Sequence, residues 1–214
     1  IISGGLGASP ETSPTPTNTA YALTKDGIAA RHDKSHLVPF GEYKPWFVRW
    51  IPIAAFSAGS FWEGPGLNTW TIPGLPPVSP LICYEMIFPG NVIKAGGPRP
   101  EWMVNISNDG WYGNTSGPRQ HFTFARFRAV EEGLPMVRVG GTGISGVIDA
   151  AGVVHHRIAY GATEVVNLPL PQPLGITPFG QNSRLSFWIV VLALILSGVT
   201  LGLARNRQNH PPKL

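Results

Sequence analysis

The sequence predicts an α/β fold, in which one turn-rich sheet domain is followed by a single membrane-spanning helix. Short apolar runs bounded by Gly, Pro, Asn or Asp are typical of strands, and several occur along the chain. One longer segment, 119–132, has helical spacing and ends at Gly133. An uncharged apolar stretch near the C-terminus is long enough to cross a bilayer.

Composition supports this prediction and excludes one class of partner. The 214 residues suit one domain with a sizeable core. Only 13% of them are charged, and 26 Gly and 22 Pro favour a sheet protein with membrane contact over a polar cytosolic enzyme. The net charge is +4, but Lys and Arg are scattered and form no basic stripe, so we expect no nucleic-acid partner.

Strands are predicted in chain order from the apolar runs. A strand at 1–5 and a Pro/Ser/Thr-rich loop at 9–18 precede a hairpin, whose strands 19–23 and 28–32 are joined by the turn 25–27. This hairpin delivers Lys34 to one end of the sheet. Further strands are expected at 70–72, 78–82, 102–107, 136–139, 147–149, 153–158 and 164–168.

Two helices are predicted within the domain. The first covers 86–94 and is ended by Gly96-Gly97-Pro98. The second covers 119–132. Its partly buried residues are expected to be Phe122, Ala125, Phe127, Ala129 and Val130.

The single cysteine, Cys83, follows the apolar run 78–82 and precedes Glu85. A thiol at a strand end, near carboxylates and with no cysteine to pair with, is a candidate nucleophile. Free cysteines are also among the most buried residues, so a structural cysteine stays open as an alternative on this stretch alone.

A second polar segment, 31–43, precedes Cys83 by about fifty residues and contains Lys34 and Glu42. A thiol that attacks a carbonyl needs a base for its proton and a cation for the oxyanion. Lys34 can supply the cation, and Glu42 can hold Lys34 in place. The alternative is a solvated surface lysine and an ordinary turn acid.

Three blocks resemble a known family: 33–43 (DKSHLVPFGEY), 82–85 (ICYE) and 106–113 (ISNDGWYG). They are similar to the apolipoprotein N-acyltransferases, the membrane-bound branch of the nitrilase (carbon–nitrogen hydrolase) superfamily. The resemblance implies a nitrilase-like α-β-β-α sandwich over 1–173, a linker over 174–184, a transmembrane helix over 185–204 and a cytoplasmic tail over 205–214.

The resemblance also implies a reaction. Cys83 would take an acyl group from a phospholipid as a thioester and pass it to the α-amine of the S-diacylglyceryl cysteine of an apolipoprotein, without a cofactor. Lys34 would stabilise the oxyanion, while Glu42 and Glu85 would orient Lys34 and tune the thiolate. The remaining implied residues, which would line the pocket, are Tyr84, Asn108 and Trp111.

The family's catalytic base is a glutamate in a Trp-Pro-Glu-like motif upstream of the lysine. We expect this glutamate upstream of Ile1, so the chain is interpreted as an N-terminally truncated fragment that is inactive alone. Pro10-Glu11-Thr12 imitates the motif, but Glu11 lies in a polar loop rather than at the end of an apolar strand.

Large apolar residues follow Tyr43, among them Trp46 and Trp50. They could pack in the core, or they could form an exposed arm that touches lipid, since Trp is favoured at membrane interfaces. The family resemblance favours the arm, because that branch carries mobile arms over its site.

Two other ligand classes are not expected. The Gly-x-Gly-x-x-Gly at 141–146 is followed by the predicted strand 147–149, so no helix is present to hold a pyrophosphate. His32 and His36 are four apart, but Pro39 and Gly41 argue against a helix and no third ligand has metal spacing.

The apolar run 187–204 has Arg184 before it and Arg205, Arg207 and Lys213 after it. The more positive side is expected to be cytoplasmic, which places residues 1–184 outside the cytoplasm. The family resemblance implies that this side is the periplasm of a bacterial inner membrane. A buried core helix is the alternative. We predict a monomer.

Two other functions stay open at this point. One is a membrane-tethered amidase or nitrilase, which would use the same residues. The other is a non-catalytic lipoprotein-binding relic.

Overall fold

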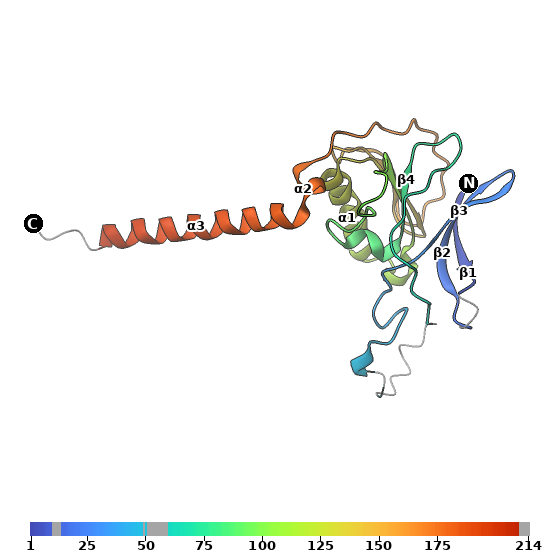
Figure 1. Ribbon diagram of the computed structural model, residues 1–214, viewed down its shortest axis with the longest axis horizontal. Helices are drawn as coiled ribbons and strands as arrows, with labels where there is room; N and C mark the ends of the chain where they lie inside the picture. The colour runs from blue at the N-terminus through green and yellow to red at the C-terminus, as the bar shows by residue number, and fades with distance from the viewer. Residues whose placement is uncertain (10–13, 49, 51–59, 210–214) are drawn as a thin grey trace, which may run out of the picture.

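The computed structural model describes residues 1–9, 14–48, 50 and 60–209. Its N-terminal part is a three-stranded antiparallel sheet (Figure 1) of β1 (Ile2–Gly7), β2 (Thr17–Thr24) and β3 (Gly27–Asp33), in the order β1-β2-β3. The predicted hairpin is confirmed. Its turn ends at Gly27, whose φ of 115° suits a residue without a Cβ. The register places Lys34 directly after the end of β3.

The second sheet has five strands in the order β4-β5-β6-β7-β8. These are β4 (Val78–Ile82), β5 (Trp102–Asn108), β6 (Met136–Gly141), β7 (Ser145–Ile148) and β8 (Val154–Ile158). The pairs β4–β5 and β5–β6 are parallel, and the remaining two are antiparallel. Because parallel strands end at the same edge, Cys83 after β4 and Asp109 after β5 lie at one edge of this sheet.

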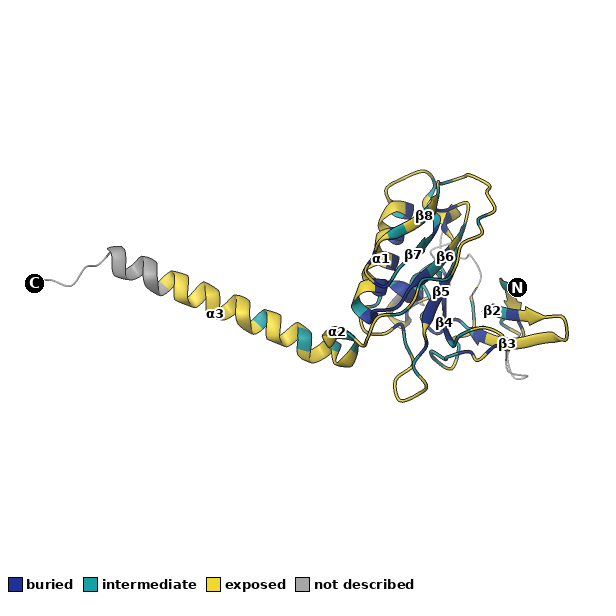
Figure 2. Cartoon of the chain, turned by 90° about the horizontal axis from the view of Figure 1, so that it is seen from above, coloured by how far each residue is buried: buried dark blue, intermediate teal, exposed yellow. Residues whose placement is uncertain are grey.

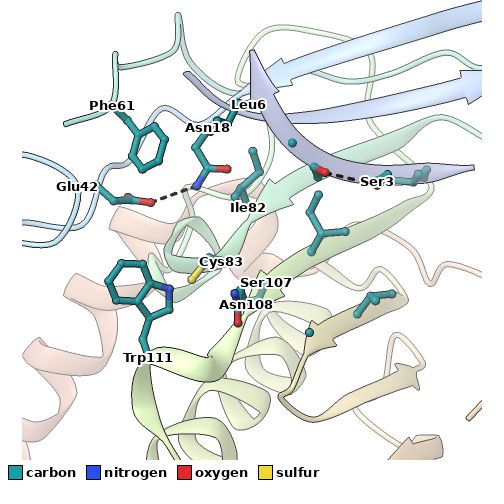
Figure 3. Close-up of a pocket in the computed structure, with 16 residues that line it drawn as sticks. Ser3, Leu6, Asn18, Glu42, Phe61, Ile82, Cys83, Ser107, Asn108 and Trp111 are labelled. Carbon is teal, nitrogen blue, oxygen red and sulfur yellow. Dashed lines mark hydrogen bonds between the residues drawn. The ribbon is translucent and has the colours of Figure 1, made fainter. Parts of the chain in front are cut away.

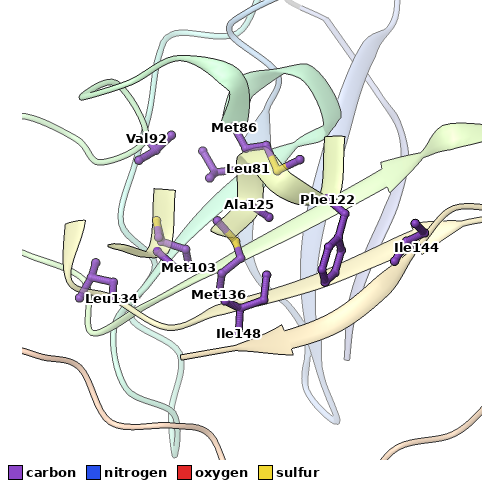
Figure 4. Close-up of a cluster of buried hydrophobic side chains, with 11 residues drawn as sticks. Leu81, Met86, Val92, Met103, Phe122, Ala125, Leu134, Met136, Ile144 and Ile148 are labelled. Atoms are coloured by element: carbon purple, nitrogen blue, oxygen red, sulfur yellow. The ribbon is translucent and has the colours of Figure 1, made fainter. Parts of the chain in front are cut away.

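The two sheets pack face to face, and α1 (Gly117–Glu132) covers the other face of the five-stranded sheet (Figure 2). One core lies between the sheets and includes Ala20, Val78 and Val104. A second core lies between α1 and the five-stranded sheet, and Figure 4 shows its side chains. Among the described residues no helix covers the outer face of the three-stranded sheet, so this part of the chain supplies a β-β-α stack of the expected nitrilase-like sandwich.

Three predicted elements differ in the structure. Residues 86–94 do not form a helix: a 3₁₀ turn, η3 (Cys83–Ile87), is followed by irregular turns. Pro89 disfavours helical backbone before it, and Gly90 has a φ of 64°. Residues 70–72 form only an isolated bridge from Trp70 to Val78, and 164–168 form no strand.

The helix α1 is present as predicted, but its buried face is narrower. Phe122, Ala125 and Ala129 face the core, whereas Phe127 is 52% exposed and Val130 is 47% exposed. The helix lies on a single sheet, so only one stripe of it is covered. Gly133 ends it in the left-handed conformation, with a φ of 65°.

The C-terminal segment forms α2 (Pro178–Gln181) and α3 (Ser183–Asn209). Figure 1 shows α3 projecting away from the sheets. Its segment Ser183–Gly202 has a mean hydropathy of 2.3 and is not buried in the protein. Twenty helical residues span about 30 Å, so this helix is long and apolar enough to cross a membrane.

Candidate active site

Cys83 occupies the first position after β4, where the chain turns sharply into η3. Its φ of 48° places it in the left-handed region, which a residue with a Cβ adopts at an energetic cost. The residue is half-buried, not sealed in the core. Strained, partly open positions of this kind are typical of reactive side chains.

Cys83 opens onto a cavity of about 520 Å³ between the two sheets (Figure 3). Glu42 and Asn18 lie on one side of it, and Trp111 lies on another. A smaller cavity of about 130 Å³ is also lined by Cys83, Glu42 and Trp111. Much of the wall of the larger cavity is apolar, so this cavity can accept a hydrocarbon chain. These wall residues are Ile2, Leu6, Phe61, Ile82, Ile106 and Val139.

Lys34 and Glu42 form a buried ion pair. The Lys34 ammonium donates a 2.6 Å hydrogen bond to Oε2 of Glu42, and Lys34 is only 1% exposed. The same oxygen accepts a 2.8 Å bond from the backbone N–H of Val38, and Asn18 donates to Oε1 at 3.2 Å. Glu42 therefore holds Lys34 on one side and lines the cavity of Cys83 on the other.

Glu85 is fully buried and binds the chain on both sides of Lys34. Its carboxylate accepts bonds from His32 Nε2 at 2.8 Å and from the backbone N–H and hydroxyl of Ser35 at 2.7 and 2.8 Å. It also accepts from the N–H of Ile82 at 2.8 Å. None of the hydrogen bonds described for Glu85 reaches the ammonium of Lys34. Glu85 instead links the neighbours of Lys34, His32 and Ser35, to the end of β4.

The environment of Glu85 keeps it ionised. Burial alone would raise its pKa, but the hydrogen bond and charge of His32 and the backbone bonds of Ile82 and Ser35 outweigh burial and lower the pKa. Because it stays ionised, the Glu85 carboxylate can keep its hydrogen bonds to His32, Ser35 and Ile82.

Only some of the residues that were expected to line the pocket do so in the structure. Asn108 and Trp111 line the larger cavity, and Asn108 caps the turn by accepting from the N–H of Gly110. Tyr84 packs its ring against Phe88 and is not among the lining residues. Trp46 and Trp50 are 77% and 80% exposed, so these two residues do not pack in the core.

A buried polar cluster behind Cys83 was not anticipated. Its members are Asn105, Asp109, His121 and Arg138, and all of them are buried. Asp109 accepts from Arg138 at 2.6 Å, from the hydroxyl of Ser107 at 2.7 Å and pairs with His121 at 2.9 Å. Burial would raise the pKa of Asp109, but His121 and Arg138 hold it well below its usual range. The one feature of the sequence that pointed to this cluster is Arg138, which lies inside an apolar strand. A buried arginine needs polar or acidic partners nearby.

Glu11 and residues 51–59 lie outside the described part of the chain. Within that part, no group of three or more His, Cys, Asp or Glu side chains could hold a metal ion.

The family model Carbon-nitrogen hydrolase matches residues 1–205. A protein named apolipoprotein N-acyltransferase from Rhodopseudomonas palustris is 41% identical in an alignment 193 residues long, which covers 86% of this chain and 35% of that protein. A protein of the same name from Bradyrhizobium diazoefficiens is 37% identical in an alignment 199 residues long, which covers 91% of this chain and 36% of that protein. The chain thus spans about a third of the length of these relatives.

Solved structures share the fold. An amidase from Nesterenkonia sp. AN1, a glutamate-to-glutamine mutant with acrylamide added to its active-site cysteine, has a TM-score of 0.55 and 20% identity over 87% of this chain and 66% of the amidase chain. A second mutant of that amidase has a TM-score of 0.54 and 18% identity over 87% of this chain and 65% of its own. The family match over nearly the whole chain and the shared architecture agree: this protein belongs to the carbon–nitrogen hydrolase family.

Proposed function

We propose that this chain carries the nucleophile and the oxyanion-stabilising lysine of an enzyme that N-acylates lipoproteins with acyl groups from phospholipid. The observation that carries the proposal is the half-buried Cys83 in a left-handed turn, on an apolar-walled cavity that it shares with Glu42, the partner of Lys34. The names of the relatives, apolipoprotein N-acyltransferase, support the choice of acceptor.

In the first step the thiol of Cys83 gives its proton to the glutamate base that the family resemblance implies, and its sulfur attacks the carbonyl carbon of a phospholipid acyl ester. A carbon–sulfur bond forms, and the carbonyl oxygen becomes an oxyanion that the ammonium of Lys34 stabilises. The ester carbon–oxygen bond then breaks, and the lysophospholipid leaves as an alcohol after it takes a proton. The acyl group remains on Cys83 as a thioester.

In the second step the free α-amine of a diacylglyceryl-modified N-terminal cysteine attacks the thioester. A carbon–nitrogen bond forms, the carbon–sulfur bond breaks, and the amine loses a proton as the thiol is regenerated. We propose that the proton carrier in both steps is the glutamate base that the family resemblance implies. The thioester conserves the energy of the ester, so the reaction as proposed uses no cofactor.

Most of the remaining side chains have a proposed role. Glu42 orients Lys34, and Glu85 fixes the segment around Lys34 through His32 and Ser35. Asn108 and Trp111 line the acyl cavity. Tyr84, which follows Cys83 in the chain, packs against Phe88 and is given no role at the cavity. Trp46 and Trp50 form an exposed aromatic surface that contacts lipid, since Trp favours the interface between water and bilayer.

The proposed setting is a bacterial inner membrane. Residues 1–173 form the catalytic domain on the periplasmic side, 174–184 form the linker, 185–204 cross the bilayer and 205–214 lie in the cytoplasm. The cationic residues after the apolar helix support this orientation. The proposed partners are the phospholipid, the lipoprotein and the membrane, and the enzyme acts as a monomer without nucleic acid.

The test is to incubate the complete protein with phospholipid that carries a radiolabelled acyl chain. We expect label on Cys83 that hydroxylamine releases, and label on an added diacylglyceryl peptide. The Cys83→Ala variant should take up no label. Ammonia release from simple amides without acyl transfer would instead assign an amidase, and binding of the lipopeptide without any label on Cys83 would assign a non-catalytic protein.

A further inference from the structure

The backbone carbonyl of Cys83 receives hydrogen bonds from two side chains that are distant in sequence. His121, on α1, lies with Nε2 at 3.2 Å from this oxygen, and Asn105, on β5, donates from Nδ2 at 3.4 Å. Asn105 also donates to the carbonyl of Leu81 at 3.3 Å. The carbonyl can only accept, so Nε2 of His121 carries the proton.

The other end of each of these side chains is fixed by a buried arginine. Arg138 binds Oδ1 of Asn105, and its Nη2 lies 3.0 Å from Nδ1 of His121. Nη2 also donates to Asp109 at 2.6 Å, and Asp109 lies 2.9 Å from the same nitrogen of His121. Arg138 and Asp109 therefore orient both residues that hold the carbonyl of Cys83.

The backbone of Cys83 needs such support. A non-glycine residue in the left-handed region persists only where its surroundings over-determine it. Two donors on the carbonyl fix the orientation of the peptide that follows Cys83 and so its ψ angle, which helps to hold the left-handed turn from which the sulfur projects. Without them the peptide can rotate to a relaxed conformation, which moves the sulfur away from the cavity.

We propose that His121 and Asn105 are positioning residues for the nucleophile. They lock the left-handed turn of Cys83 through its carbonyl, and the Asp109–Arg138 pair keeps the ring of His121 in the orientation that this bond needs. The proposal rests on the proposed function only in taking Cys83 as the nucleophile. Neither residue touches the substrate, so their effect reaches the reaction through the placement of the sulfur.

Two substitutions at position 121 separate this role from a merely structural one. The amide nitrogen of glutamine falls close to the place of Nε2, so His121→Gln keeps a donor for the carbonyl of Cys83. The shorter asparagine places its amide near Nδ1, so His121→Asn keeps the contact with Asp109 and Arg138 and loses the bond to Cys83. The control is His155→Asn, because His155 also pairs with an aspartate, Asp149, through Nε2 at 2.9 Å, but does so at the surface.

The first readout is the rate constant with which excess iodoacetamide alkylates Cys83 in the complete protein, followed on the peptide that contains Cys83 across pH 6 to 10. The second is formation of the acyl-enzyme from labelled phospholipid. We expect His121→Asn to lower the acylation rate by about 100-fold, because a misplacement of 1 Å has that effect, with the KM for phospholipid little changed. Alkylation of His121→Asn should be slower than that of the wild type at every pH. In His121→Gln both the alkylation rate and the acylation rate should lie within about fivefold of the wild-type values.

The outcomes distinguish the hypotheses. Faster alkylation of His121→Asn would mean that the substitution only loosens the fold and exposes the thiol. Equal decreases of the acylation rate in His121→Asn and His121→Gln would show that the bond to the carbonyl of Cys83 has no role. Either result overturns the proposal. Slower alkylation of His121→Asn with no acyl-enzyme in the wild type would support the positioning role and overturn the proposed acyltransferase.

Discussion

The ammonium of Lys34 lies 2.6 Å from Oε2 of Glu42, and both side chains are almost completely buried. Removing one partner of such a pair leaves an uncompensated charge in the interior, which costs far more than the intact pair contributes. The Lys34–Glu42 pair should therefore affect both the free energy of unfolding and the proposed acylation, and suitable substitutions can separate these two effects.

The substitution Lys34→Met should abolish acylation and lower the free energy of unfolding by about 3 to 5 kcal/mol, because Glu42 stays buried without its cation. The double variant Lys34→Met/Glu42→Gln should recover most of that stability and remain inactive. Chemical denaturation and acyl-enzyme formation measure the two quantities. An active double variant would show that the cation is not needed for the oxyanion.

Substitutions of Cys83 should separate reactivity from backbone strain. Cys83→Ala and Cys83→Ser should both lack acyl-enzyme, since alanine has no nucleophile and a serine hydroxyl is much less acidic and much less nucleophilic than a thiol. Cys83→Gly should be equally inactive but more stable than Cys83→Ala by about 1 kcal/mol, because glycine adopts a positive φ without strain. Transfer at the wild-type rate by any of the three would reject Cys83 as the nucleophile.

The buried carboxylate of Glu85 should contribute to acid sensitivity. Its pKa in the folded protein lies below its ordinary value of 4.5. Its contribution to stability is therefore fully present above pH 4.5 and is lost as the pH falls through the folded pKa. Glu85→Gln should be less stable than the wild type at pH 7 and should lose less stability on acidification.

The control for Glu85 is Glu101→Gln, which changes an exposed carboxylate. Thermal unfolding between pH 7 and pH 3 compares the three proteins. An equally steep acid loss in wild type and Glu85→Gln would assign the acid sensitivity to other groups, such as Asp109.

The exposed tryptophans should matter for the lipid donor rather than for the chemistry. Trp46→Ala/Trp50→Ala should raise the KM for phospholipid in mixed micelles by about tenfold, which corresponds to the loss of about 1.4 kcal/mol of apolar contact. The rate at saturating lipid should change little. Phe127→Ala removes a half-exposed aromatic ring from α1 and is the control. An equal effect of Phe127→Ala would indicate nonspecific loss of apolar surface.

Local sequence patterns predicted much of the framework, since each element depends on neighbouring residues. The hairpin around Gly27, the strand before Cys83 and the end of α1 at Gly133 agree with the structure. The expected helix at 86–94 was wrong because helical spacing of apolar residues does not require a helix. Met86 and Val92 fill the core from irregular turns instead.

The sequence by itself determined the apolar length of α3, the position of the lone thiol at a strand end, and the presence of Lys34 and Glu42 in one short segment. Tertiary structure alone decided that Glu85 binds His32 and Ser35, about fifty residues away, and that Asp109, His121 and Arg138 meet behind Cys83. Hydrogen bonds between strands and helices that are distant in sequence depend on register and packing. The local pattern of apolar and polar residues does not determine which buried donor will face which acceptor.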